Sequence, residues 1–136
     1  EAQFLSMRLH SKWIGEKPEE IYATGGASAN REILRVAADI FNTKVRIFDV
    51  PDSAALGAAF RSGKSYYDSI NVKKEWSDLV KQFLYIEGSE VIRPTEACRQ
   101  LYDDMLKIYG KYENFILKNA ENPETYRLEF VEKYFN

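Results

Sequence analysis

Two adjacent glycines, Gly25 and Gly26, separate a short apolar stretch from a helix-like pattern in IYATGGASANREI, residues 21–33. When a strand ends in glycines and enters a helix, the first helical amides lack partners and carry a partial positive charge. Glycine has no side chain to keep a ligand away, and it adopts backbone angles closed to other residues. The segment therefore predicts an anion site, where a phosphate or a ribose lies against the backbone.

A purely structural turn is the alternative interpretation of the same residues. Glycine pairs form ordinary tight turns, and Ser28 or Asn30 could simply cap the following helix. Glu32 in the first helical turn would weakly repel a phosphate. The motif G-x-x-x-x-G-K-[ST] is absent, and TGGASAN lacks the G-x-G-x-x-G spacing, which disfavours a dinucleotide fold. Spacing alone leaves the ligand site and the simple turn both open.

A strand, a helix and a second strand are predicted to position this turn. IYA at 21–23 indicates a short buried strand, apolar residues at helical spacing follow from Asn30 to Phe41, and KVRIFDV at 44–50 indicates a strand that ends at Pro51. Strands joined through a helix are parallel and buried on both faces, and two strands alone are marginal in water. We therefore expect more of the sheet to lie outside this sequence.

Further helices are predicted around this unit. Residues 1–15 carry Phe4, Leu5, Leu9 and Trp13 at helical spacing. PDSAALGAAF at 51–60 predicts a helix capped by Asp52 or Ser53, whose small residues either allow close packing or merely favour a helix. For residues 66–94 the prediction is limited to EWSDLVKQFLYI, which suggests a helix turning into a strand.

Two C-terminal helices are predicted, a long one from Thr95 and a short one that starts at Pro123. The long helix has an apolar seam that we expect to dock on a neighbouring domain. This seam consists of Leu101, Met105, Ile108, Tyr112 and Phe115. An alternative interpretation is an aromatic cage for a cationic ligand, built from Tyr102, Tyr109 and Tyr112.

The composition restricts the class of protein. The 136 residues favour one globular domain, with 45% hydrophobic and 14% aromatic residues, and the formal net charge of −2 argues against a nucleic-acid partner. Single copies of histidine and cysteine, His10 and Cys98, exclude a disulfide framework and a Cys/His zinc site within one copy. With no membrane-length apolar run and no secretory signal, we expect a cytoplasmic protein without a membrane partner. Because helical spacing begins at Glu1, the sequence looks like part of a longer chain.

Four ordered blocks carry a resemblance to a known family. EAQFLSMRLHSKWIG, IYATGGASANREILRVAADIFNTKV and DSAALGAAFRSG resemble the C-terminal part of the FGGY family of carbohydrate kinases. VIRPTEACRQLYDDMLKIYGKYENFIL resembles the tail of the eukaryotic-type xylulose kinases of that family. The resemblance covers nearly the whole chain and is weakest between about residues 66 and 90.

The resemblance implies an α/β fold. Residues 1–66 would form part of the C-terminal actin-like, ribonuclease H-like ATPase domain of a sugar kinase. Residues 67–136 would be a mainly helical extension that docks on the same domain. In this superfamily two related domains close around the substrates, and the second domain supplies the adenosine side of the ATP site. The helix around Gly57 would pack behind that site in a structural role.

The resemblance also implies site residues. Gly25, Gly26 and Ala27 would lie along the ribose and phosphates of ATP, and Asn30 would reach the adenine. Mg²⁺ would be held by the phosphates and by residues upstream. The general base and the sugar contacts would also lie upstream, so we assign no catalytic residue and no metal ligand here. The carboxylates Asp39, Asp49, Asp52, Asp103 and Asp104 are interpreted as solvated surface or helix caps.

The expected function is that of a C-terminal nucleotide-binding fragment of a kinase that converts D-xylulose to D-xylulose 5-phosphate with ATP. The fragment alone is expected to be inactive, since the sugar would be bound mainly by an N-terminal part. Exposed apolar surface predicts self-association into a homo-oligomer. Alternatives are a kinase for glycerol or another pentulose, a non-catalytic nucleotide-binding member of the superfamily, and a helical interaction module.

Overall fold

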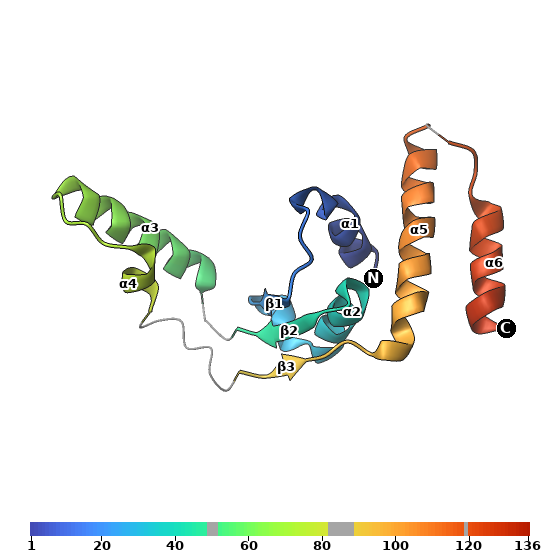
Figure 1. The fold of residues 1–136 in the computed structure, drawn as a ribbon, viewed down its shortest axis with the longest axis horizontal. Coiled ribbons are helices and arrows are strands. Elements are labelled where there is room, and N and C mark those ends of the chain that lie inside the picture. The colour runs from blue at the N-terminus through green and yellow to red at the C-terminus, as the bar shows by residue number, and fades with distance from the viewer. Residues whose placement is uncertain (49–51, 82–88, 119) are drawn as a thin grey trace.

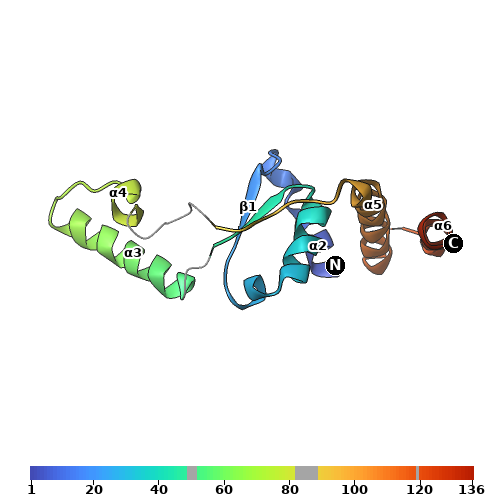
Figure 2. The ribbon, with the colours of Figure 1, turned by 90° about the horizontal axis from the view of Figure 1, so that it is seen from below.

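The computed structural model describes residues 1–48, 52–81, 89–118 and 120–136. The elements lie in a row, with the small sheet near the middle, the α3–α4 pair at one end and α6 at the other (Figures 1 and 2). In chain order they are α1 (Ala2–His10), η1 (Lys12–Ile14), β1 (Glu20–Ala23), η2 (Gly26–Ala29), α2 (Arg31–Phe41), β2 (Lys44–Ile47), α3 (Ser53–Ser69), α4 (Trp76–Val80), β3 (Val91–Ile92), η3 (Glu96–Cys98), α5 (Arg99–Ile116) and α6 (Glu124–Phe135).

The sheet has the strand order β1-β2-β3. β1 and β2 are parallel, with Ile21 opposite Val45, which confirms the predicted strand, helix and strand. β2 ends at Ile47, and the remainder of the predicted strand beyond residue 48 lies outside the described residues. β3 adds an antiparallel edge, with Ile92 opposite Val45. One further strand therefore comes from within the chain, at a position that the sequence did not reveal.

Helix α2 covers one face of the sheet. Its buried residues Leu34, Ala37 and Ala38 pack with Val45, which is fully buried. On the opposite face Tyr22 is 50% exposed, and Arg46 pairs with Glu20 at 2.9 Å. This ion pair lowers the pKa of Glu20. We expected the parallel strands to be buried on both faces, but the described residues bury only the face that packs against α2.

A second apolar cluster joins α5 to α1 and α2. Leu5, Ile40, Tyr102 and Leu106 are its buried members. Burial and the nearby Glu1 carboxylate raise the pKa of Tyr102. The buried stripe of α5 is therefore centred on Tyr102 and Leu106, with Leu101 and Met105 of the predicted seam packed beside it, while Phe115 at the other end of the seam is 38% exposed. Docking of the seam on a neighbouring domain stays a prediction. Several stripes of α5 are apolar, and its packing partners decide which one is buried.

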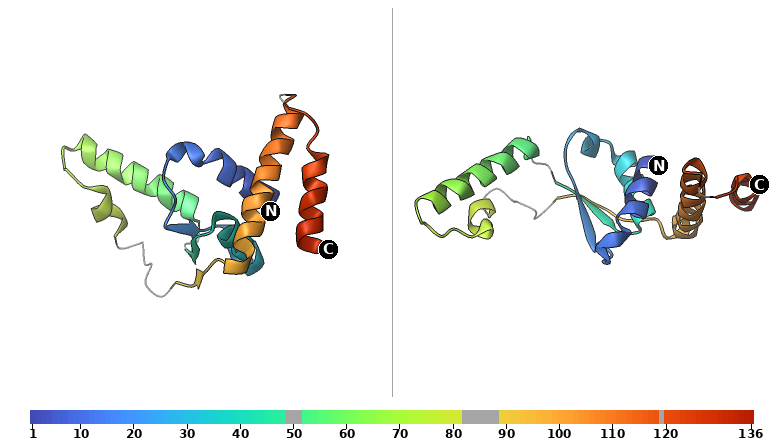
Figure 3. Two further views of the ribbon diagram at one scale, coloured as in Figure 1. Left: turned by 45° about the vertical axis from the view of Figure 1, so that its right-hand side comes forward. Right: turned by 90° about the horizontal axis from the view of Figure 1, so that it is seen from above.

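Helices α3 and α4 form an arm at the far end of the row (Figure 3). The predicted α3 is present, but none of its residues is buried, and a side-chain carbon added at Gly57 would meet no atom within 4 Å. Close packing around Gly57 is thus not found in the described part of the chain. Asp52 occupies the N-cap position with φ of 51° and makes no side-chain capping bond, so the predicted hydrogen-bonded cap is wrong.

The remaining helices differ from the predictions in detail. α1 ends at His10, and Trp13 lies in the short η1 turn with 84% exposure, so it does not continue the apolar face of the helix. α6 follows Pro123 as predicted. The aromatic cage is not formed, because the Tyr102 hydroxyl donates to Glu1 and the Tyr112 hydroxyl donates to Glu124. Within the described residues, no helix is long and apolar enough to span a membrane.

Candidate functional site

The glycine turn connects the end of β1 to the start of α2. Gly25 has φ of +87°, a conformation that side-chain-bearing residues rarely adopt. The Ser28 hydroxyl donates to the Gly25 carbonyl at 2.6 Å, and the Ser28 amide donates to the same oxygen at 3.0 Å. The chain then forms one short turn, η2, before α2 begins. Glycine at position 25 is therefore required by the backbone itself.

The surface of the turn is open. Gly25, Gly26 and Ala27 are exposed, and a side-chain carbon added at either glycine would meet no atom of the described residues within 4 Å. Among the described residues, the amides of these three positions have no hydrogen-bond acceptor. Three successive donors thus face solvent without a side chain between them. Such a group of donors suits an anionic oxygen.

Asn30 has a definite structural role at the start of α2. Its side-chain oxygen Oδ1 accepts from the Glu32 amide at 3.0 Å and from the Ile33 amide at 3.3 Å. Of the two capping candidates, Asn30 is therefore the N-cap residue, whereas Ser28 bonds within the turn. The Asn30 amide nitrogen Nδ2 makes no hydrogen bond to any described residue, so it retains donor capacity toward a ligand.

The charged side chains at the start of α2 already have partners. Arg31 pairs with Glu90 at 2.7 Å, and Arg35 lies 4.0 Å from Glu32. All four are substantially exposed, so each pair stabilises the helix only weakly. The turn therefore offers neutral amide donors and the helix dipole. Most of the charge of a bound phosphate would have to be balanced by other groups.

A contact between two hydroxyl groups beside the turn was not predicted from the sequence. Thr24 donates through Oγ1 to Ser53 Oγ at 3.3 Å, which links the end of β1 to the first residue of α3. Neighbouring parallel strands end at the same edge of a sheet, so the register of β1 and β2 could have indicated this proximity. Both side chains add polar groups close to the open amides.

The carboxylates singled out in the sequence make structural contacts. Asp39 is 7% exposed and accepts from the Thr95 amide at 2.6 Å, so its assignment to solvated surface is wrong. Asp103 pairs with Arg8 at 2.6 Å. Asp104 accepts from Lys133, Lys107 and Tyr134, and these contacts hold its pKa well below the ordinary range. Asp49 lies outside the described residues.

None of these groups is arranged as a metal centre. Within the described part of the chain, no three His, Cys, Asp or Glu side chains lie close enough together to hold a metal ion. The strong polar contacts of Asp39, Asp103 and Asp104 fasten helices to one another. The glycine turn remains the candidate site.

Comparison with known proteins identifies the relatives of this sequence. Residues 1–66 match the FGGY family of carbohydrate kinases, C-terminal domain. Over these residues, just under half of the chain, the sequence is similar to the C-terminal domain of this kinase family. The matched range includes the glycine turn and most of α3.

Individual relatives extend the match beyond residue 66. The chain is 33% identical over 126 residues to the xylulose kinase of Rattus norvegicus, covering 90% of this chain and 23% of the rat protein. It is 47% identical over 68 residues to xylulose kinase 2 of Arabidopsis thaliana, covering 48% of this chain and 12% of that protein. The chain therefore spans less than a quarter of the length of the relatives it matches.

A solved structure supports the fold. The ligand-bound xylulose kinase of Lactobacillus acidophilus superposes with a TM-score of 0.65 at 20% identity, covering 84% of this chain and 22% of that protein. The predicted α/β fold of a sugar kinase C-terminal domain is confirmed by this match and by the family match.

Proposed function

We propose that this chain is the C-terminal nucleotide-binding part of a xylulose kinase. The protein that contains it would transfer the terminal phosphoryl group of ATP to D-xylulose, giving D-xylulose 5-phosphate. The open glycine turn carries this proposal, because it presents three amides without an acceptor among the described residues, in a chain similar to the rat xylulose kinase. We further propose that the protein acts in xylose metabolism in the cytoplasm.

In this proposal the turn contacts the nucleotide mainly through its backbone. Gly25, Gly26 and Ala27 lie along the ribose and phosphates, where each amide bond to a charged oxygen contributes roughly 1.5–3 kcal/mol. Asn30 donates from Nδ2 to the adenine while its Oδ1 continues to cap α2. Capping fixes the orientation of the amide group and so prepares it for the base.

The groups that complete the reaction are proposed to lie outside this sequence. Mg²⁺ would be held by the ATP phosphates and by residues elsewhere in the protein, and it would balance phosphate charge that the paired Arg31 leaves uncompensated. The general base and most sugar contacts would come from the same missing part. Residues 1–66 would belong to the ATPase domain and residues 67–136 to its docked extension. We therefore expect no kinase activity from residues 1–136 alone.

Gly26→Val in the full-length protein tests the nucleotide contact. Space at this position is open in the structure, so the valine should fold in place and occupy the room that the proposed ligand needs. Loss of one charged hydrogen bond predicts an increase in the KM for ATP of about tenfold or more, with the KM for the sugar unchanged. Steady-state kinetics with each substrate varied in turn measures both values. An unchanged KM for ATP would show that the glycine pair forms a structural turn that does not contact the nucleotide.

A matched pair of alanine variants separates ligand contact from backbone strain. Gly15 and Gly25 both have positive φ, at +76° and +87°, and both have open space where a side chain would begin. Gly15 lies in the left-handed helical region with ψ of −11°, whereas Gly25 has ψ of −173°, a conformation reached almost only by glycine, so Gly25→Ala should lose at least as much stability as Gly15→Ala in urea unfolding. Only Gly25→Ala should raise the KM for ATP.

A panel of sugars tests the substrate. D-xylulose should give the highest kcat/KM when compared with D-ribulose, L-xylulose and glycerol at saturating ATP. A preference for glycerol or another pentulose would keep the family but replace the substrate. ATP binding without turnover of any sugar would favour a non-catalytic member of the superfamily.

A further inference from the structure

A cavity of about 520 Å³ lies between α1, the segment that follows it, the end of α2 and α5. Phe41, the last residue of α2, and Pro18, which precedes β1, are among its lining residues. The glycine turn lies at the other end of both elements, between the end of β1 and the start of α2. The two sites are therefore at opposite ends of the β1–α2 unit.

The lining of this cavity is rich in cations. Arg8, Lys12, Lys17 and Lys107 face two acidic residues, Glu16 and Asp103, although the whole chain has a formal net charge of −2. The cations come from α1, from the segment around η1 and from α5, so folding brings them together. A local excess of positive charge in an acidic protein concentrates anions at that place.

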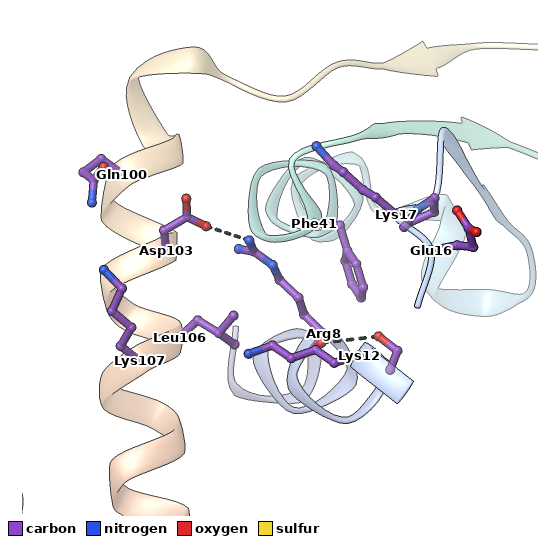
Figure 4. A pocket seen from close by; sticks show the side chains of 11 residues that line it. Arg8, Lys12, Glu16, Lys17, Phe41, Gln100, Asp103, Leu106 and Lys107 are labelled. Carbon is purple, nitrogen blue, oxygen red and sulfur yellow. Dashed lines mark hydrogen bonds and ion pairs between the residues drawn. The ribbon is translucent and has the colours of Figure 1, made fainter. Parts of the chain in front are cut away.

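Arg8 retains donors that can reach a ligand. Its side chain extends from α1 toward Asp103 on α5, beside Phe41 (Figure 4). One terminal nitrogen donates to Asp103 at 2.6 Å, and the side chain is 25% exposed. The other guanidinium nitrogens have no partner among the described residues. Because a guanidinium carries five N–H donors, Arg8 can hold Asp103 and an anion at the same time.

The two lysines on the amino-terminal side of the cavity are also available. Lys12 and Lys17 are exposed, and neither forms an ion pair with a described residue. Lys107 differs, because it donates to Asp104 at 2.9 Å. Phe41 and Leu106 add apolar wall to the cavity, and a partly apolar wall strengthens nearby electrostatic interactions.

We propose that this cavity binds a small organic anion with two negative charges, of the phosphomonoester or dicarboxylate type. Its volume falls in the range of about 300–1,000 Å³ that is typical of small-molecule sites. Arg8 would hold the anion at the helix interface, and Lys12 and Lys17 would close over it. Glu16 would oppose binding. The site is separate from the glycine turn, so the inference does not rest on the proposed kinase activity.

NMR titration of ¹⁵N-labelled residues 1–136 with glucose 6-phosphate tests the proposal, with succinate and uncharged glucose as comparison ligands at constant ionic strength. Amide shifts should concentrate at residues 8–18 and 100–107 with an anion and be absent with glucose. Whether glucose 6-phosphate or succinate binds more tightly identifies the anion class. Lys12→Ala should weaken binding about threefold, and the Lys12→Ala, Lys17→Ala double variant about tenfold.

Two further variants complete the test. Glu16→Gln should strengthen binding, because it removes the opposing charge without removing volume. Lys73→Ala removes a lysine whose side chain is 91% exposed, near α4, and should leave the affinity unchanged. The proposal fails if the double variant binds as well as the unchanged chain, if Lys73→Ala weakens binding equally, or if the shifts centre on residues 24–30.

Discussion

Helices α2 and α3 come after the parallel strands β1 and β2, respectively, yet they are held very differently. α2 has five buried residues and a side-chain cap from Asn30. α3 is longer, with 17 residues against 11, but it has no buried residue and no side-chain capping bond. Helical sequence signals therefore specify that a helix forms, whereas its anchoring depends on whether a partner surface is present.

The largest expected effect comes from the same substitution, leucine to alanine, made in each of the two helices. Leu34 in α2 is 4% exposed and packs against the sheet, so Leu34→Ala should lower the free energy of unfolding by about 2–5 kcal/mol. Leu56 in α3 lies among residues without buried neighbours on that helix, so Leu56→Ala should cost less than about 1 kcal/mol. Urea unfolding followed by circular dichroism measures both. Equal losses would show that α3 is anchored as firmly as α2.

A smaller effect should distinguish the two helix starts. Asn30→Ala removes an acceptor used by two backbone amides and should cost about 1 kcal/mol. Asp52→Asn keeps the size of a side chain that makes no capping bond, and it should change stability by less than about 0.5 kcal/mol. Thermal unfolding of both variants at one pH provides the comparison. A larger loss in Asp52→Asn would contradict the assignment of the caps.

Helix α6 sharpens the comparison, because it also lacks buried residues but is fastened by polar contacts. Glu124 accepts from Arg127 and from Tyr112 on α5, and these contacts lower its pKa from the ordinary 4.5 to about 2. The folded pKa lies below the unfolded value, so this stabilisation is present above about pH 5 and is lost as the pH falls toward 2.

Acid titration of α6 measures this smallest effect. Amide NMR signals of α6 should show weakening of its contact with α5 across that pH range, and Glu124→Gln should reduce the pH dependence. Glu121→Gln, which changes an exposed residue before the helix, serves as the matched control. An acid response that is the same in Glu124→Gln and in the unchanged chain would remove Glu124 from this role.

Local signals explain what the sequence predicted correctly. The apolar spacing from Asn30 to Phe41 and the alternation after Lys44 depend on neighbouring residues, and the structure has α2 and β2 there. Glycine in the turn indicated that unusual backbone angles were available, and Gly25 adopts one of them with positive φ. The contacts of Gly25, Gly26, Ala27 and Asn30 with a nucleotide stay predictions.

The features that escaped prediction depend on distant partners. β3 is only two residues long, too short for any alternation, and pairing with β2 creates it. The buried stripe of α5 is chosen by α1 and α2, which lie far earlier in the chain. Asp39 resembled a surface residue because its partner, the Thr95 amide, is 56 positions away. No local pattern carries such information.

The bond between Asp39 and Thr95 ties the C-terminal end of α2 to the segment that leads into α5. Asn30 caps the first turn of the same helix next to the glycine turn, roughly 14 Å along the axis from Asp39. Deleting the chain from Thr95 onward would leave the buried Asp39 carboxylate without its donor, which costs about 1–3 kcal/mol or more. Truncation of the tail would therefore destabilise α2, and with it the position of the glycine turn, although no residue of the turn is removed.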